Sequence, residues 1–451
     1  MTRYLQCRIA IVLCIAASVA ACSHAGPVRE NQPIESGHDA LPDDFGTYRF
    51  ADGRCVTGGR FDESGTQRLL LTDVWRNRLG GLFEGNGAAF DSVMDPAVSI
   101  SFEDGRERLT WNTASMRQVA VRVHAPRRIE ANFESDGARL AGTLYLPSRQ
   151  AGHALPGIVL AHGSGPQNRY AGPWTSFFVD LGFAVLSYDK RGVDASGGDL
   201  ETADYARLET DLAAAVRWLA ARPEVDGQRV GIHASSQSGW YAPSVAADAP
   251  LAFLLVRAGP TLPTGPTTLH ERVHEWRADG LDEAAVKQAS RLWTALMALA
   301  ARDGTRDAAQ SLLDAARAEA WFAPAYGDWS TVRAEWWRQQ RVNAAYRPVE
   351  DLARHALPTL WFLAERDENV PYPESAAALQ AHARAAGSSA SAPSVALVIV
   401  REAGHDFLVR ADGGPVRYTD DYWPRMAEWL RQYGFTGPAT PALDCAGAQT
   451  G

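Results

Sequence analysis

The spacing of hydrophobic and polar positions changes along the chain. This change divides the chain into a β-rich part and a part in which strands and helices alternate. Between residues 43 and 126, short apolar runs alternate with Gly and Asp turns, which predicts a small β-rich accessory module. From residue 127 to about 435, apolar strands alternate with amphipathic helices, which predicts an α/β fold with a doubly wound, mostly parallel sheet. The strands expected in the first part cover 68–72, 97–102 and 117–124.

The mixed part opens with a hairpin expected over 128–147. A helix over 205–221 is predicted because its apolar residues recur on one face with the helical period. The other predicted strands cover 157–161, 183–188, 229–234, 251–256, 358–363 and 394–400, and a last amphipathic helix covers 421–433.

Residues 260–352 interrupt this alternation with helical sequence rich in Ala and Arg. This is too much helix for one crossover, so it predicts a cap domain over the C-terminal edge of the sheet. Its tryptophans could line an apolar pocket, but for most of them we favour packing in the cap's own core. They are Trp276, Trp293, Trp321, Trp329, Trp336 and Trp337.

Residues 1–22 have the pattern of a secretory signal. Arg3 and Arg8 precede a mostly apolar run over 9–20, which is too short to span a membrane. The end of this segment, Val-Ala-Ala-Cys22, resembles a bacterial lipobox. That resemblance implies lipidation of Cys22 and anchoring to a bacterial membrane facing the periplasm.

The alternative is an ordinary cleavage site, with Ser-Val-Ala at 18–20, which gives a soluble periplasmic or secreted protein. Residues 23–42 are expected to be a polar tether, and 436–451 a C-terminal tail.

The composition is that of a globular protein, with 451 residues, 46% hydrophobic residues and a formal charge of −9. The length suggests two domains, or one large domain with an insertion. The negative charge argues against nucleic acid as a partner. The chain contains no CxxC or P-loop pattern, and neither a metal nor a cofactor is predicted.

Cysteine usage leaves one possible disulfide. Of the five cysteines, Cys7 and Cys14 would leave with the signal, and Cys22 is the candidate lipid site. Cys55 and Cys445 could pair in an oxidising compartment and join the tail to the N-terminal module. The alternative is two free thiols, and the sequence leaves this open.

The stretch GIHASSQSGW, 231–240, follows a predicted strand and precedes a predicted helix, which suits a nucleophile elbow. The elbow needs small residues two positions before and two after the nucleophile. Ser235 and Ser238 fail this test because each has a large neighbour. Ser236 passes because Ala234 and Ser238 flank it, although both glycines of the G-x-S-x-G pattern are replaced. The alternative is a polar helix N-cap.

A serine hydroxyl needs a base, and the base needs an orienting carboxylate. Two loops after late strands supply them, with Asp367 in ERDENVP and His405 in EAGHDF. Glu365 and Glu368 compete for the acid role, and Asp367 is preferred. The order Ser236, Asp367, His405 matches the order of nucleophile, acid and base in hydrolases with such an elbow.

An oxyanion needs backbone N–H donors. One is expected from Gln237, directly after the nucleophile. The other is expected from Ser164, or alternatively Gly163, in the glycine-rich turn that follows an early strand.

Together these pieces resemble the α/β-hydrolase family over about 127–435, through HGSGPQNR, YDKRGVDASGGD, ASSQSGW, ERDENVP and EAGHDF. They are most similar to bacterial dienelactone hydrolases and serine aminopeptidase-like esterases. The resemblance implies that Ser236 is the nucleophile, His405 the base and Asp367 the acid. It also implies that Asp189 and Arg191 are structural, as a buried ion pair or a loop anchor.

The expected activity is hydrolysis of a small-molecule carboxylic ester through an acyl-enzyme, without a cofactor. A peptidase or an acyltransferase could use the same triad, and a non-catalytic surface lipoprotein is a further alternative. A peptidase would need an acidic or carbonyl anchor in the cap for a free amino terminus; Glu271, Glu275 and Glu335 are available, but their spacing singles none of them out. The sequence does not give the oligomeric state.

Overall fold

The computed structural model describes residues 46–437 and Cys445, except 64–65, 76–79, 86–88, 94, 149–152, 250, 387–394, 410–416 and 420. The expected signal segment, the tether, Cys22 and nearly all of the tail lie outside the described residues. No helix in the described ranges is both long enough and apolar enough to cross a bilayer.

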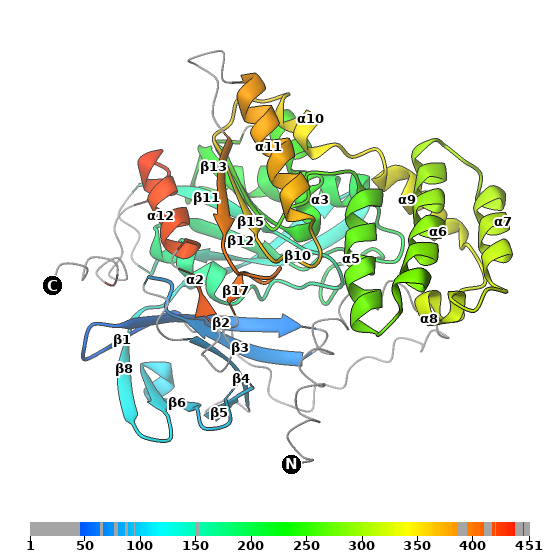
Figure 1. Ribbon diagram of the computed structural model, residues 1–451. Helices are drawn as coiled ribbons and strands as arrows, with labels where there is room; N and C mark the ends of the chain where they lie inside the picture. Colours follow the sequence, from blue (N-terminus) through cyan, green and yellow to red (C-terminus); the bar gives the residue numbers. More distant parts are fainter. Residues whose placement is uncertain are drawn as a thin grey trace.

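The N-terminal module is a closed antiparallel barrel in which each strand pairs with the next and β1 pairs with β8 (Figure 1). Its interior is filled by twelve buried apolar side chains, among them Tyr48, Phe83 and Trp111. The three strands expected from sequence are therefore part of a larger closed set. The strands are β1 Gly46–Phe50, β2 Cys55–Glu63, β3 Thr66–Thr72, β4 Gly80–Gly85, β5 Ala89–Ser92, β6 Ser99–Glu103, β7 Arg108–Asn112 and β8 Arg117–His124.

The second part holds an eight-stranded sheet of order β16-β15-β14-β13-β11-β12-β10-β9. Strands β11 to β16 are parallel, and β9 and β10 form an antiparallel hairpin at one edge. The predicted α/β fold is thereby confirmed. The strands are β9 Arg127–Ser135, β10 Ala138–Leu146, β11 Leu155–Ala161, β12 Ala184–Tyr188, β13 Val225–Ser235, β14 Phe253–Arg257, β15 Thr359–Ala364 and β16 Val395–Val400.

Successive residues of the central strands contribute to two hydrophobic cores, because side chains alternate between the faces of a sheet. Val159 packs in one core and Ile158 in the other. The first core contains residues of α3 Tyr205–Ala220, α4 Ala242–Asp248, α10 Pro348–Leu352 and α11 Tyr372–Ala386. The second contains residues of α2 Pro173–Asp180 and α12 Trp423–Gln432.

The barrel packs on the face of the sheet that α2 and α12 cover (Figure 1). Val74 and Trp75, which follow β3, share the second core with Phe177 of α2. Cys55 and Cys445 form a disulfide that joins the start of β2 to the C-terminal region. Barrel and sheet therefore share one hydrophobic core as well as a covalent bond.

A helical cap follows β14 and precedes the return of the chain to the sheet, as expected (Figure 1). The predicted interval ends with α10, whose Leu352 packs in the core of the sheet. Trp276, Trp293 and Trp337 are buried in the cap's own core, and the other three tryptophans pack against it. The cap helices are α5 Thr264–Ala278, α6 Glu283–Ala301, α7 Arg306–Ala316, α8 Phe322–Tyr326 and α9 Ala334–Asn343.

Candidate active site

Ser236 lies at a sharp turn between the central strand β13 and helix α4. It begins the short 3₁₀ segment η2, Ser236–Gly239, and has φ of +50°. A residue with a Cβ rarely adopts this left-handed conformation, and such strain is found most often at functional sites. The geometry is that of the strained elbow expected from the sequence.

The three neighbouring serines make different contacts. The Ser236 hydroxyl lies 3.0 Å from Nε2 of His405. Ser235 accepts a hydrogen bond of 3.0 Å from Arg257. Ser238 is fully buried, and its hydroxyl accepts the Ser235 N–H at 2.7 Å. Only Ser236 therefore points its hydroxyl at the imidazole, while Ser238 closes the turn from inside.

The close approach behind the elbow involves Gly239, which the sequence analysis did not single out. A Cβ added at Gly239 would lie 2.5 Å from Cα of Gly259, at the loop after β14. The backbones of these two glycines therefore touch. The steric test used on the sequence considered positions two residues from Ser236, whereas the tightest backbone contact lies three residues after it.

His405 and Asp367 meet at the ends of β16 and β15. Nδ1 of His405 lies 2.9 Å from Oδ1 and 3.0 Å from Oδ2 of Asp367. The Asp367 side chain is 1% exposed, and its Oδ1 also accepts the N–H groups of Asn369 and Val370, each at 2.9 Å. These contacts fix the carboxylate, which in turn orients the imidazole.

The two competing carboxylates occupy other positions. Glu365 accepts the Glu402 N–H at 2.9 Å, and Glu368 accepts the backbone N–H of His405 at 3.3 Å. Neither hydrogen-bonds to the imidazole ring. Of the three acids in this loop, Asp367 is the one that the structure brings to Nδ1.

The environment of His405 raises its pKa. Burial alone would lower the pKa, but the charge of Asp367 and the hydrogen bond to it outweigh this effect. The neighbouring carboxylate thus stabilises the imidazolium that forms when His405 accepts a proton.

The glycine-rich turn lies against Ser236, but the two expected donors in it differ. The N–H of Gly163 donates to Oε1 of Gln167 at 2.8 Å, so this donor is already engaged, which corrects the expectation for Gly163. The Ser164 N–H has no backbone acceptor among the described residues. With Gln237 directly after the nucleophile, Ser164 is left as the second candidate donor. A Cβ at Gly163 would lie 3.5 Å from Cβ of Ser236, which shows how close the turn is.

Lys190, which the sequence analysis did not identify, connects this turn to the elbow. Its buried ammonium group donates to the carbonyl oxygens of Gly163 and Gly165 at 2.9 and 3.1 Å, and to Oε1 of Gln237 at 2.7 Å. Its one distinguishing feature in the sequence is its place two residues after the end of β12, within YDKRG.

Asp189 and Arg191, on either side of Lys190, are not paired with each other. Asp189 accepts hydrogen bonds from Arg169 at 2.7 and 3.0 Å. Arg191 donates to Asp211 of α3 at 2.9 Å. Both residues thus anchor the loops around the turn.

Helix α5 of the cap places Glu271 beside the loop that carries Asp367. His270 lies 3.0 Å from the backbone oxygen of Asp367, and Glu271 is the next residue. Burial and the charge of Glu275 raise the pKa of Glu271 to about 7, and both His405 and Asp367 act on it electrostatically. Glu335 instead pairs with Arg338 at 2.5 Å. Of the three acids considered for an anchor, Glu271 is therefore the one whose pKa responds to the charges of His405 and Asp367.

No group of three or more His, Cys, Asp or Glu side chains in the described part of the chain is arranged to hold a metal ion.

Three comparisons place the chain among known proteins. An uncharacterised protein of Pseudomonas aeruginosa is 32% identical over 98 residues, which is 21% of this chain and 26% of that protein. A protein of Escherichia coli is 29% identical over 109 residues, which is 24% of this chain and 37% of that protein. The match thus spans only about a quarter to a third of the curated relatives.

Solved structures to which the chain is similar include an esterase of Pyrococcus furiosus, with 14% identity, a TM-score of 0.44 and coverage of 68% of this chain and 91% of that chain. An acylaminoacyl peptidase of Pyrococcus horikoshii has 13% identity, a TM-score of 0.45 and coverage of 84% of this chain and 56% of that chain.

The family model of the X-Pro dipeptidyl-peptidases (S15 family) matches residues 136–405, which is more than half of the chain. The match includes the elbow and the loop that carries Asp367, and it ends at His405. The resemblance to α/β hydrolases is thereby confirmed. This chain belongs to the X-Pro dipeptidyl-peptidase family S15.

Proposed function

We propose that the protein is a serine hydrolase that cleaves a carboxylic ester through an acyl-enzyme on Ser236. The observation that carries the proposal is the contact of 3.0 Å between the Ser236 hydroxyl and Nε2 of His405, whose Nδ1 is held by Asp367. The left-handed backbone at Ser236 supports it, because it turns the hydroxyl out of the strand toward the imidazole.

In the proposed reaction, His405 takes the proton of Ser236 while Oγ attacks the carbonyl carbon of the ester. The negative charge on the former carbonyl oxygen is held by the N–H groups of Gln237 and Ser164. The imidazolium then gives its proton to the leaving alcohol as the C–O bond breaks. Water, deprotonated by His405, attacks the acyl-enzyme and releases the acid together with free Ser236.

A second candidate is a peptidase that acts on a substrate with a free amino terminus. The S15 family is a peptidase family, and Glu271 supplies a carboxylate near the triad. The charge of Arg272 lowers the pKa of Glu271, but by less than burial and Glu275 raise it. An ammonium group beside the scissile bond would find its counter-ion there. An acyltransferase would use the same acyl-enzyme with another acceptor in place of water.

A fluorophosphonate probe tests the proposal, because it reacts only with an activated serine. We expect labelling of the wild-type protein at Ser236, no labelling of Ser236→Ala, and normal labelling of Ser115→Ala, in which an exposed barrel serine is changed. Folded wild-type protein that stays unlabelled would support a non-catalytic binding protein instead. A panel of nitrophenyl esters and aminoacyl amides then separates esterase from peptidase.

We also propose that the protein is exported and lipid-anchored at Cys22, its only link to a membrane, and that it acts on small molecules in the cell envelope. The disulfide between Cys55 and Cys445 supports an oxidising compartment. In a bacterial host, Cys22→Ser should move the protein from the membrane fraction to the soluble fraction. Unchanged fractionation would contradict the anchor.

A further inference from the structure

We infer that the barrel positions the oxyanion loop, residues 162–172, through Arg60 and Asp62 of strand β2. This inference rests on the proposed function, since it assigns the barrel a part in the same reaction. The loop connects β11 to α2 and carries the candidate donor Ser164.

The backbone of β2 contacts the end of this loop directly. Phe61 forms an antiparallel bridge with Ala171, and the Gly172 N–H donates to the Arg60 oxygen at 2.8 Å. A Cβ added at Gly59 would lie 2.4 Å from the Gly172 oxygen, so the two segments are in direct backbone contact. The end of the oxyanion loop is thus held against β2 by an isolated β-bridge and a backbone hydrogen bond.

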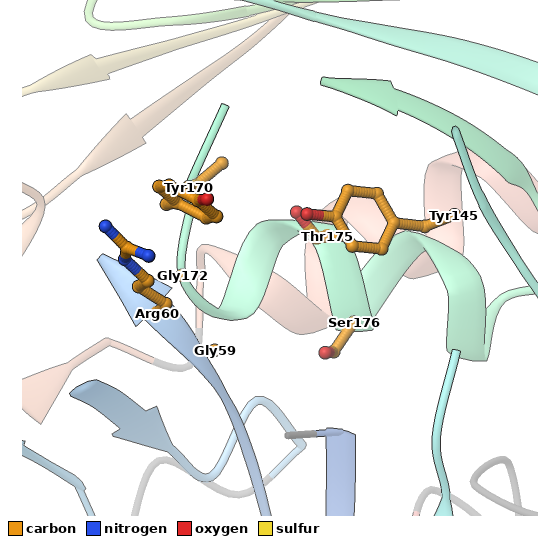
Figure 2. Close-up of a pocket in the computed structure, with 8 residues that line it drawn as sticks. Gly59, Arg60, Tyr145, Tyr170, Gly172, Thr175 and Ser176 are labelled. Carbon is orange, nitrogen blue, oxygen red and sulfur yellow. The ribbon is translucent and has the colours of Figure 1, made fainter. Parts of the chain in front are cut away.

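Two side chains of β2 extend the contact toward the middle of the loop. The Arg60 guanidinium lies 3.6 Å from the ring centre of Tyr170, and Figure 2 shows the two side chains side by side at the pocket between β2 and the start of α2. Arg60 is bonded to Asp62 at 2.6 Å, and both side chains are at most 10% exposed. Such a pair is held in place, because separating two buried charges leaves each of them without a partner.

Asp62 in turn binds Asn168. The Asn168 amide nitrogen donates to Oδ2 of Asp62 at 3.0 Å and to Oδ2 of Asp194 at 2.8 Å. The two protons of this nitrogen thereby join the barrel to the loop after β12. The Oδ1 atom of Asn168 accepts the Tyr170 N–H at 3.1 Å, which fixes the turn between them.

A short path leads from Asn168 to the candidate donor. The preceding residue, Gln167, binds the Gly163 N–H through Oε1, and its backbone oxygen accepts the Lys190 N–H at 3.0 Å. Ser164 follows Gly163 directly. A shift of Asn168 would therefore move Gln167 and, through Gly163, the N–H of Ser164.

The barrel itself is firmly attached at this place. Ser176 in α2 donates to the Gly58 oxygen at 3.1 Å, and Asp180 at the end of α2 accepts hydrogen bonds from Thr47 and from His124 at 2.5 and 2.6 Å. The barrel therefore forms hydrogen bonds with both the middle and the end of α2. These contacts can hold the loop that precedes the helix.

The test compares Asp62→Ala and Asn168→Ala with Asp62→Asn, which keeps an acceptor, and with Glu84→Ala. Glu84 pairs with Arg68 on the barrel, is 47% exposed in its side chain and touches no part of the loop described above. For each variant, kcat and KM for an ester are measured, together with the inhibition constant of a trifluoromethyl ketone, whose adduct with serine carries an oxyanion.

We expect Asp62→Ala and Asn168→Ala to lower kcat about tenfold with KM within about twofold, because misplaced donors weaken binding of the transition state more than of the substrate. The inhibition constant should rise by a similar factor. Asp62→Asn should restore most of the loss, and Glu84→Ala should behave as wild type. Thermal unfolding of each variant checks that the fold is retained, and Asn168→Ala leaves the barrel sequence intact if Asp62→Ala does not fold.

A kcat and an inhibition constant within twofold of wild type in folded Asn168→Ala would overturn the inference. An equal loss in Glu84→Ala would also overturn it, since the effect would then be general destabilisation of the barrel. A wild-type protein without turnover and without fluorophosphonate labelling would instead contradict the proposed function, so the two failures are distinguishable.

Discussion

Nζ of Lys190 lies 2.7 Å from Oε1 of Gln237 and thus ties the residue after the nucleophile to the oxyanion loop. The same ammonium group binds two carbonyl oxygens of that loop. One buried cation therefore sets the spacing between the two candidate oxyanion donors.

Replacing Lys190 by Met should disturb that spacing. Three acceptors would lose their donor, and each unsatisfied buried group costs about 1 to 3 kcal/mol. We expect kcat to fall by about 10- to 100-fold, on the scale of a lost oxyanion donor, and the midpoint of thermal unfolding to fall as well. The matched control is Lys287→Met, because Lys287 is exposed on α6. Wild-type kcat in a folded Lys190→Met protein would contradict this role.

The raised pKa of His405 sets the direction of the pH dependence. The imidazole can accept a proton only when it is neutral, so activity should be lost as the pH falls through a value above 6.5, the ordinary pKa of histidine. Asp367→Asn removes the charge that raises the pKa and leaves burial, which lowers it. The acid limb of kcat/KM should then move to lower pH, while kcat falls by about 10³- to 10⁴-fold. An acid limb that stays in place in Asp367→Asn would argue against this coupling.

Glu271 should distinguish between amines and neutral substrates. With a pKa of about 7, its carboxyl group is protonated in mild acid and charged in mild base. If it binds an ammonium group, Glu271→Gln should raise KM for aminoacyl amides by about tenfold or more, the worth of a hydrogen bond to a charged group. KM for a neutral nitrophenyl ester should stay nearly constant. Glu335→Gln is the control, and equal effects on both substrate classes would refute an amine anchor.

Gly239 should not tolerate a side chain. Gly239→Ala would place a methyl group 2.5 Å from Cα of Gly259, so the turn or the loop must move. We expect a loss of about 1 to 3 kcal/mol in the free energy of unfolding, typical of overpacking, together with reduced fluorophosphonate labelling. Gly197→Ala is the control, because a Cβ there meets its nearest atom at an ordinary 3.4 Å. Denaturant unfolding measures the difference.

The sequence was sufficient for the main strands of the sheet and for the three residues that meet at the candidate site, because both follow local signals. Apolar runs between turns mark buried strands, and Ser236, Asp367 and His405 each follow one. Closure of the barrel was not predictable in this way. It depends on the pairing of β1 with β8, which lie far apart in the chain and carry no local sign of partnership.

The partners of buried polar residues were also beyond the sequence. Asp189 and Arg191 are two positions apart, yet they bind Arg169 and Asp211. The Gly163 N–H was the alternative to Ser164 as an oxyanion donor, but it donates to Gln167 four residues later in the chain. In each case the direction of a side chain, rather than its type, decides the contact.

The disulfide between Cys55 and Cys445 encloses 390 positions of sequence, including the barrel's second strand, the whole sheet and the cap. A protease that cuts any exposed loop in between would leave two fragments that remain covalently linked. Such a nicked protein should migrate as one species on a denaturing gel without thiol and separate once reductant is added. The bond therefore keeps the chain in one piece after a single cleavage.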